Sequence, residues 1–240
     1  MAEVTSSPSP PPTRRVFLRR TRFGLELRVD GTLASLVRPG SASTGPVWDA
    51  LAAPLLALRP RPRPRILLLG LGGGSVARVA RALLPGALIV GVERDREVVD
   101  LARAELGLDH VEVEVVCEDA FHYLRRERRR FDAVVEDLMV GTPRSVRKPE
   151  GLTASYGLVT ARVAAGGVVV VNTIHEAPEM TRVLSRASGT LLRIDVEGYY
   201  NRILALGPAT LRAATLRRRL SEQPALATSL RRLHLRTLRP

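Results

Sequence analysis

Apolar and polar positions along this chain form blocks that predict strands followed by helices. From residue 66 onward, short apolar runs recur, and each is followed by a stretch in which apolar residues repeat every three or four positions. The runs are typical of strands buried on both faces, and the stretches are typical of amphipathic helices. Strands are expected near residues 66–70, 88–93, 111–116, 132–137, 167–172 and 202–206, with a further one near 190–195. Helices are expected near residues 75–84, 95–105, 119–127, 153–164 and 177–187.

This alternation predicts an α/β fold with a doubly wound, mostly parallel, Rossmann-like sheet of seven strands. Helices should cover both faces of the sheet, and a ligand should bind beyond the carboxyl ends of the strands. A small β-hairpin region is expected before it, because residues 16–29 and 32–37 look like two strands joined at Asp30-Gly31, a strong hairpin signal. Residues 48–58 have helical spacing.

The predicted organisation has five parts. They are a disordered tail (1–13), the N-terminal hairpin and helix (14–58), an Arg-Pro connector (59–65), the α/β domain (66–207) and a basic helical extension (208–240). The Pro- and Ser-rich tail lacks the basic start and apolar core of a secretory signal, and no apolar run approaches the ~20 residues of a membrane helix. The single Cys117 excludes an internal disulfide and fits a cytoplasmic location. Cys117 is expected to be buried at the end of a strand.

The net charge of +13 is carried almost entirely by arginine, since Lys148 is the one lysine. GC-rich codon usage explains this bias more easily than selection for phosphate contacts does. The arginines cluster at residues 14–22, 59–65, 125–130 and 212–239. A solvated surface is the favoured interpretation of these clusters, and nucleic-acid binding is possible but not favoured. The aromatic content of 4% argues against a stacking platform for single strands.

The strongest functional signal is a glycine turn between the first two strands of the α/β domain. Gly70, Gly72 and Gly74 allow a tight turn that brings backbone N–H groups close to a ligand. Glu93 ends the next strand about 20 residues later, where a carboxylate can accept both hydroxyls of a ribose. An adenosine-containing ligand is therefore expected. The third glycine of the dinucleotide fingerprint would fall at Ser75, which disfavours an NAD-dependent dehydrogenase.

Further polar residues follow other strands of the predicted sheet. Asp119 and Ala120 follow the third strand, where they can read the exocyclic amine of adenine, and Glu136-Asp137 ends the fourth. Asn172-Thr173 and residues 198–201 lie at the ends of later elements. Each is an ordinary cap or loop residue when taken alone, but their shared position favours a ligand site. The four histidines are scattered, so no metal site is expected.

The segment from about residue 64 to residue 207 resembles the class I S-adenosylmethionine-dependent transferases, and most closely the spermidine synthase group of aminopropyltransferases. The resemblance rests on the sequences ILLLGLGGGSVAR, GVERDREVVDLAR, CEDAFHYL and FDAVVED. The most specific of these is VERDREVV, because the family has Val-Glu-x-Asp-x-x-Val-Val where Glu93 would hold the ribose. The resemblance implies a class I methyltransferase fold and S-adenosylmethionine, or its decarboxylated form, as cofactor.

Departures from the family pattern fall on the acceptor side. The glycine loop of true spermidine synthases carries an Asp that helps hold the aminopropyl amine, and Gly73 stands there in this chain. Ala34 replaces the glutamine usual after the hairpin, and Val47 replaces a tyrosine. The family pairs two aspartates three residues apart to orient and deprotonate the attacking amine. Asp137 matches the first of them and Val140 occupies the second position, so the diamine site looks dismantled.

The chemistry of the two transfers favours a methyltransferase. Aminopropyl transfer to a diamine needs closely placed carboxylates that hold a dication and deprotonate one amine. Glu136 cannot replace the missing carboxylate, because adjacent strand residues point to opposite faces. Methyl transfer needs mainly alignment of nucleophile and methyl group, with at most one base, and Asp137 is the candidate for that catalytic role.

The sequence therefore predicts a cytoplasmic S-adenosylmethionine-binding transferase with a small-molecule acceptor, either a methyltransferase or an enzyme of altered acceptor specificity. An aminopropyltransferase of polyamine synthesis with a reorganised acceptor site is the first alternative. The second is a non-catalytic protein that keeps the nucleoside pocket and binds a polyanionic partner through its arginines. The free edge of the N-terminal hairpin makes a homodimer possible.

Overall fold

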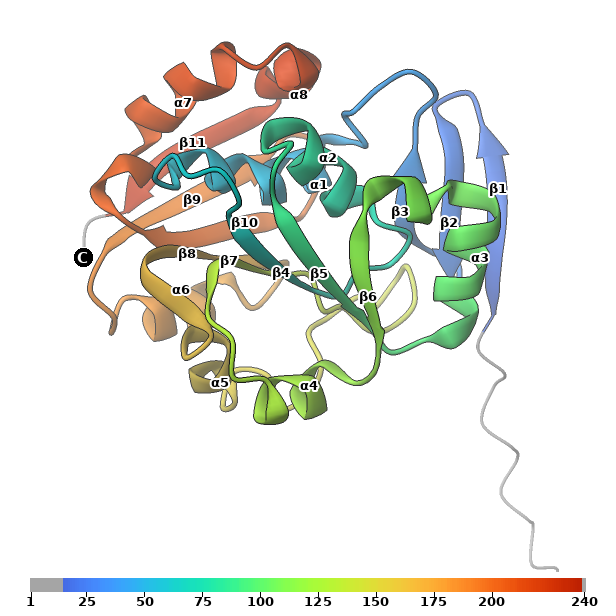
Figure 1. The fold of residues 1–240 in the computed structure, drawn as a ribbon, viewed down its shortest axis with the longest axis horizontal. Coiled ribbons are helices and arrows are strands. Elements are labelled where there is room, and N and C mark those ends of the chain that lie inside the picture. The colour runs from blue at the N-terminus through green and yellow to red at the C-terminus, as the bar shows by residue number, and fades with distance from the viewer. Residues whose placement is uncertain (1–14, 239–240) are drawn as a thin grey trace, which may run out of the picture.

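The predicted doubly wound α/β fold is present as an eight-stranded, mostly parallel sheet with helices on both faces (Figure 1). The computed structural model describes residues 15–238, so the tail predicted over residues 1–13 lies outside the described residues. The strands of the sheet are β4 (Arg65–Leu69), β5 (Leu88–Glu93), β6 (Val113–Cys117), β7 (Phe131–Glu136), β8 (Val163–Thr173), β9 (Thr190–Val196), β10 (Arg202–Gly207) and β11 (Leu233–Leu238). The helices of this part are α2 (Ser75–Leu83), α3 (Arg96–Leu106), α4 (Ala120–Arg126), α5 (Tyr156–Thr160), α6 (Ala177–Leu184), α7 (Ala213–Ser221) and α8 (Ala227–Leu230).

The strand order explains where a ligand can bind. The order across the sheet is β11-β9-β10-β8-β7-β4-β5-β6, and β4 to β8 pair in parallel. From β4 the chain goes to β5 and β6 on one side, and afterwards to β7 and β8 on the other. The order therefore reverses between β4 and β7. Open α/β sheets bind their ligands at such a switch point, outside the carboxyl ends of the strands.

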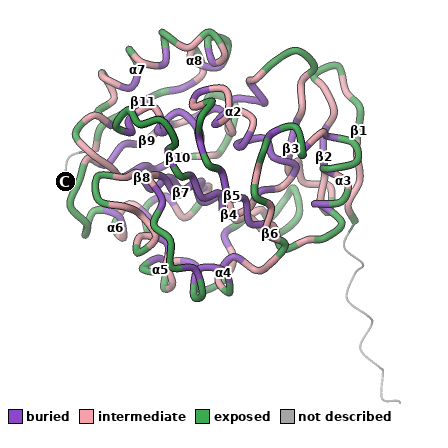
Figure 2. Tube along the Cα trace, in the orientation of Figure 1, coloured by how far each residue is buried: buried purple, intermediate pink, exposed green. Residues whose placement is uncertain are grey.

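The two faces of the sheet carry separate apolar cores. Figure 2 shows that the strands at the centre of the molecule are mostly buried. Alternate residues of β4 supply both: Ile66 and Leu68 pack with α2 and α3, whereas Leu67 and Leu69 pack with α4, α5 and α6. Successive strand residues point to opposite faces, so a continuous apolar run can fill two cores. Single 3-10 turns also occur at η1 (Ala53–Ala57), η2 (Leu108–Val111), η3 (Ala209–Leu211) and η4 (Pro224–Leu226).

The N-terminal region is a three-stranded antiparallel sheet of β1 (Val16–Thr21), β2 (Gly24–Val29) and β3 (Thr32–Val37). The hairpin at Asp30-Gly31 is confirmed, but the single strand predicted over residues 16–29 is wrong. It divides at a turn in which the Thr21 hydroxyl donates to the carbonyl oxygen of Gly24, 3.2 Å away. Gly24 has a φ of 135°, and a side chain there would collide with the Val37 carbonyl.

The C-terminal extension is only partly helical. The prediction of a helical extension over residues 208–240 is wrong for β11, which pairs antiparallel with β9 and adds an eighth strand to the sheet. Within β11, Leu233 and Leu235 are buried whereas His234 and Arg236 are exposed, which is the period-two pattern of an edge strand. The many leucines and arginines of the segment concealed this short alternation.

A buried polar cluster joins the C-terminal extension to α1 (Pro46–Ala52). The Asp49 carboxylate accepts hydrogen bonds from the hydroxyls of Ser43 and Ser229 and from the Thr44 N–H. Burial raises the pKa of Asp49 despite these donors. The extension is therefore fixed to the N-terminal region through side chains far apart in the sequence.

Three smaller expectations also need correction. The helix expected over residues 48–58 is divided into α1 and the 3-10 turn η1, which has Pro54 in its first turn. The helix expected over residues 153–164 is reduced to α5, because Val163 already pairs with Phe131 at the start of β8. Cys117 is exposed, since β6 is the edge strand of the sheet. None of the helices within residues 15–238 is long and apolar enough to cross a membrane.

Candidate active site

A cavity of about 580 Å³ lies at the switch point between β4 and β7. Six of the seven residues proposed from the sequence line it: Gly70, Gly72, Glu93, Asp119, Ala120 and Asp137. They follow β4, β5, β6 and β7 in turn, so the common position of these strand ends brings them together. The seventh, Gly74, is the N-cap residue of α2 and does not line the cavity.

The glycine turn is shaped by two close approaches of the backbone. Gly70 has a φ of 85°, and a Cβ there would lie 2.6 Å from the carbonyl oxygen of Asp137. The Asp137 N–H in turn donates to the carbonyl oxygen of Leu69 over 2.8 Å. Gly74 also has a φ of 85° and approaches Leu108. Glycine at position 70 lets the chain after β4 pass close to the end of β7, and glycine at position 74 makes room for the Leu108 side chain.

Glu93 is held over the glycine turn by backbone donors. One carboxylate oxygen accepts from the Gly72 N–H over 2.9 Å, and the other accepts from the Asp95 N–H over 3.1 Å. Asp95 caps α3 through its own side chain. The loop between β5 and α3 therefore presents a half-buried carboxylate in a fixed orientation.

On the next loop, Asp119 caps α4 by accepting from the N–H groups of Phe121 and His122. This ordinary capping role does not remove Asp119 from the cavity wall, which it shares with Ala120 and Phe121. The end of β6 thus supplies a carboxylate and a backbone segment beside Glu93.

Asp137 is positioned by a chain of side-chain amides. Asn172, at the end of β8, donates to Asp137 Oδ1 over 2.7 Å, and Asn201 donates to Asn172 Oδ1 over 2.9 Å. Burial raises the pKa of Asp137 to about 6, although the hydrogen bond from Asn172 and the charge of Lys148 oppose this shift. The sequence marked Asn172 and Asn201 as strand-end residues, and the structure joins both to the candidate base.

The residue before Asp137 in the sequence, Glu136, belongs to an ion pair that the sequence did not predict. Lys148 Nζ contacts both carboxylate oxygens of Glu136, at 2.6 and 2.8 Å, and the two side chains are 5% and 0% exposed. Glu136 also accepts from the Leu138 N–H over 2.6 Å. Burial raises the pKa of Glu136, and the Lys148 charge opposes the rise. As expected from strand geometry, Glu136 points away from the cavity that Asp137 lines.

The ion pair fastens the loop of residues 138–148, which covers part of the cavity. Val140 and Arg147 form an antiparallel bridge across this loop. Its far end meets the N-terminal hairpin, where the Thr32 hydroxyl donates to the carbonyl oxygen of Gly141 over 3.4 Å. The two segments in which the sequence departs from the family pattern therefore meet over one side of the site.

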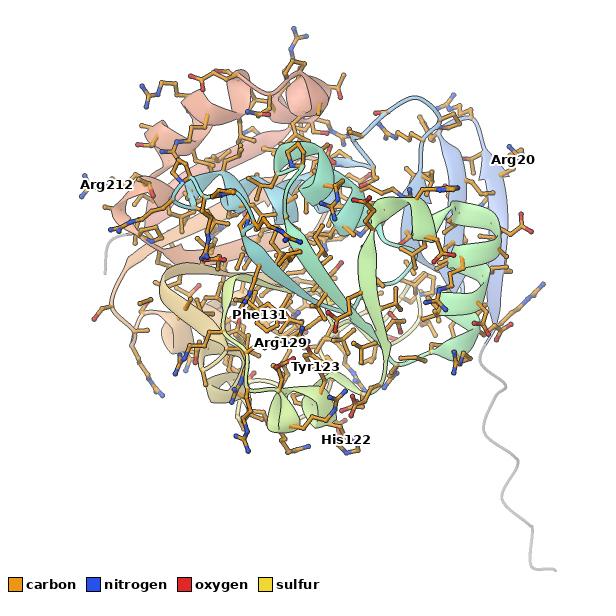
Figure 3. All side chains as sticks on the ribbon, in the orientation of Figure 1. Arg20, His122, Tyr123, Arg129, Phe131 and Arg212 are labelled. Carbon is orange, nitrogen blue, oxygen red and sulfur yellow. The ribbon has the colours of Figure 1, made fainter. Side chains whose placement is uncertain are left out.

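The exposed arginines of residues 15–238 are spread over different sides of the molecule. Figure 3 shows Arg20 and Arg212 on opposite sides of the molecule, so the clusters at the two ends of the chain do not merge. Others are paired with carboxylates: Arg126 with Glu118 at 2.5 Å, and Arg129 with Glu127 at 2.8 Å. Within residues 15–238, no group of His, Cys, Asp and Glu side chains is arranged to hold a metal ion.

The profile of the Spermine/spermidine synthase domain matches residues 54–197, which include the glycine turn, Glu93, Asp119 and Asp137. The chain belongs to this family. No curated protein sequence matches this member of the spermine/spermidine synthase family.

Solved structures share the fold at low sequence identity. A probable spermidine synthase from Corynebacterium glutamicum is 18% identical, with a TM-score of 0.74 over 94% of this chain and 88% of that one. The spermidine synthase of Thermotoga maritima is 17% identical, with a TM-score of 0.61 over 82% and 70%. Human methyltransferase-like protein 13 is 22% identical, with a TM-score of 0.61 over 77% and 91%. These likenesses show the Rossmann-like fold of spermidine synthases and methyltransferases.

Proposed function

We propose that this family member is a methyltransferase, which transfers the methyl group of S-adenosylmethionine to a small-molecule acceptor in the cytoplasm. The proposal is carried by Gly73, which replaces the aspartate that would hold an aminopropyl amine. A Cβ at this position would lie 2.5 Å from Leu106 Cδ1 and 2.9 Å from Ser35 Cβ. The Gly73 N–H donates to the Ser35 hydroxyl oxygen over 2.7 Å. An acidic side chain at this position would therefore require the side chains of Leu106 and Ser35 to shift.

The other side of the cavity lacks the second aspartate of the family's diamine site. Val140 stands where the second diamine-binding aspartate would be, and Val47 and Trp48 line the wall contributed by α1. Glu136 is no substitute, because Lys148 neutralises it outside the cavity. Burying a diamine dication without paired carboxylates is unfavourable, whereas an acceptor with one nucleophilic group needs only Asp137.

The residues on the cavity wall fit an adenosyl cofactor. Glu93, Gly70, Gly72, Asp119 and Ala120 all line the cavity. In this proposal Glu93 accepts the ribose hydroxyls, the two glycines leave the backbone open to the ligand, and Asp119 and Ala120 read the adenine. Human methyltransferase-like protein 13, which shares the fold, was crystallised with S-adenosylhomocysteine, and a spermidine synthase with the analogue AdoDATO. S-adenosylmethionine, when bound, supplies a methyl group already activated on a sulfonium sulfur.

Asp137 then has two tasks that its surroundings allow. Asn172 fixes one carboxylate oxygen, and Oδ2 makes no hydrogen bond to any described residue. Oδ2 can accept a hydrogen bond from the acceptor and so orient its nucleophilic atom. With a pKa of about 6, the carboxylate is ionised near neutral pH and can also take the acceptor's proton.

Replacing Glu93 by alanine is expected to weaken binding of S-adenosylmethionine by about 1.5 to 3 kcal/mol, the range for hydrogen bonds to a charged group. Calorimetric titration measures this loss. Asp100→Ala is a matched control, since it removes an exposed carboxylate of α3. Unchanged affinity in a folded Glu93→Ala protein would show that Glu93 does not hold the ribose.

The by-product nucleoside distinguishes the proposed reaction from its alternative. Methyl transfer leaves S-adenosylhomocysteine, whereas aminopropyl transfer from the decarboxylated cofactor leaves 5′-methylthioadenosine. The protein should be incubated with each cofactor and a panel of hydroxyl- and amine-bearing acceptors that includes putrescine and spermidine. We expect S-adenosylhomocysteine with at least one acceptor. Methylthioadenosine formed only in the presence of a polyamine would instead establish an aminopropyltransferase.

A further inference from the structure

Arg38 is a cation of the cavity wall that has no hydrogen-bond partner. It follows β3 directly and lines the cavity. Its Nε atom is buried and unpaired, and its guanidinium makes no hydrogen bond to any described residue. The other arginines of the wall differ: Arg28 contacts Glu26 and the Gly31 carbonyl, and Arg94 is exposed to water. Leaving a buried donor unpaired costs free energy, so an unpaired guanidinium in a ligand cavity indicates an anionic ligand group.

Asp49, which is within range of the Arg38 charge, does not serve as this partner. The charge of Arg38 opposes the rise in the pKa of Asp49 that burial causes, but the two side chains form no ion pair. The Asp49 oxygens instead accept from Ser43, Ser229 and the Thr44 N–H. The Arg38 fork therefore remains available for a ligand.

The position of Arg38 links it to the methionine end of the cofactor. The segment just before it is fastened to the glycine turn: the Ser35 hydroxyl oxygen accepts from Gly73 N–H, and Leu36 N–H donates to the Ser75 hydroxyl over 2.9 Å. In spermidine synthases, the aspartate at the position of Gly73 holds the aminopropyl amine. This chain has no negative charge at that position, and the unpaired Arg38 follows Ser35 by three residues. The exchange of a carboxylate for a guanidinium favours a carboxylate over an amine at this end of the ligand.

We propose that Arg38 binds the α-carboxylate of S-adenosylmethionine and makes the site selective against the decarboxylated cofactor. A guanidinium can donate two parallel hydrogen bonds to a carboxylate, and the decarboxylated cofactor has no group to accept them. The proposal rests on the proposed function, because it assumes that the cavity holds an adenosyl sulfonium compound.

The test is a titration of three ligands against matched variants. The ligands are S-adenosylmethionine, its decarboxylated form and 5′-methylthioadenosine, which share the adenosine but differ in the chain on sulfur. Arg38→Met should lower the affinity for S-adenosylmethionine by about 10- to 100-fold. The affinities for the other two ligands should change by no more than about twofold. Arg38→Lys should have an affinity for S-adenosylmethionine between those of the parent and Arg38→Met, because lysine keeps the charge but not the two parallel donors of the guanidinium. Arg20→Met, an exposed arginine of β1, controls for loss of charge.

Each other outcome has a distinct meaning. An equal loss of affinity for all three ligands would overturn the proposal and would show that Arg38 supports the cavity wall. No loss for any ligand would also overturn it. If cofactor affinity is unchanged but the KM of an acidic acceptor rises, the carboxylate belongs to the acceptor, which contradicts the proposal as well. If the parent protein binds none of the three ligands, the proposed function itself fails.

Discussion

Replacing Lys148 by methionine is expected to lower the free energy of unfolding by about 3–5 kcal/mol, the cost of leaving one partner of a buried ion pair without the other. Both oxygens of Glu136 contact the ammonium group, and neither side chain reaches solvent to a useful extent. Methionine has a similar length, so the change removes the charge with little loss of volume. Denaturant unfolding monitored by circular dichroism measures the difference.

Two controls distinguish loss of the pair from loss of packing. The double variant Glu136→Gln with Lys148→Met removes both charges and should regain most of the stability, since replacing a buried pair with neutral groups is often close to neutral. Arg126→Met breaks an exposed ion pair with Glu118 and should cost less than about 1 kcal/mol. A Lys148→Met protein as stable as the parent would show that Glu136 takes up a proton at negligible cost, and that the pair does not hold the loop of residues 138–148.

Replacing Asp137 by asparagine is expected to lower turnover by about 10²- to 10⁴-fold, the usual contribution of a positioned general base. Affinity for S-adenosylmethionine should change little, because the role proposed for Asp137 is contact with the acceptor. The rate of the parent enzyme should fall as pH decreases through about 6, where Asp137 takes up a proton, and the asparagine variant should lose this dependence. Asp100→Asn on α3 is the matched control. Unchanged turnover would make Asp137 a structural residue at the end of β7.

The same substitution should stabilise the protein at higher pH. Burial raises the pKa of Asp137 from 3.8 to about 6, so the native state binds this proton more tightly than the unfolded state does. The stabilisation is present below the unfolded pKa and is lost as pH rises through the folded pKa. Asp137→Asn should therefore have a higher Tm than the parent at about pH 8 but not at about pH 4. A lower Tm of Asp137→Asn than of the parent at the higher pH would contradict the conclusion that burial disfavours the ionised Asp137.

The sequence predicted the parts of the fold that depend on local pattern. Strands β4 and β5, most of β7 and the second half of β8 are short apolar runs, and the glycine turn, Glu93 and Asp119 follow strands in the expected order. Because parallel strand ends share one edge of the sheet, their convergence on one cavity could also be predicted. The division of the N-terminal strand near Gly24 and the alternation in β11 were missed, since each depends on a few residues within arginine- and leucine-rich sequence.

The missed features of the site depend on contacts between distant residues. Nothing in the local sequence pairs Glu136 with Lys148 or leaves Arg38 without a partner, because these properties arise only when the loops are folded over the sheet. One signal was available for Lys148, which is the one lysine in a chain with 37 lysine and arginine residues. Lysine and arginine are not interchangeable where space is limited. The single lysine, Lys148, could therefore have been singled out as a residue whose compact ammonium group matters.

The central claim is that the cavity binds a methyl donor. Calorimetric titration of the protein with S-adenosylmethionine and with its decarboxylated form tests it most directly, because the two ligands differ only in the α-carboxylate. The structure predicts tighter binding of S-adenosylmethionine, since Gly73 leaves no carboxylate for the aminopropyl amine and Arg38 is unpaired. Tighter binding of the decarboxylated form would contradict the account and would restore aminopropyl transfer as the function of this protein.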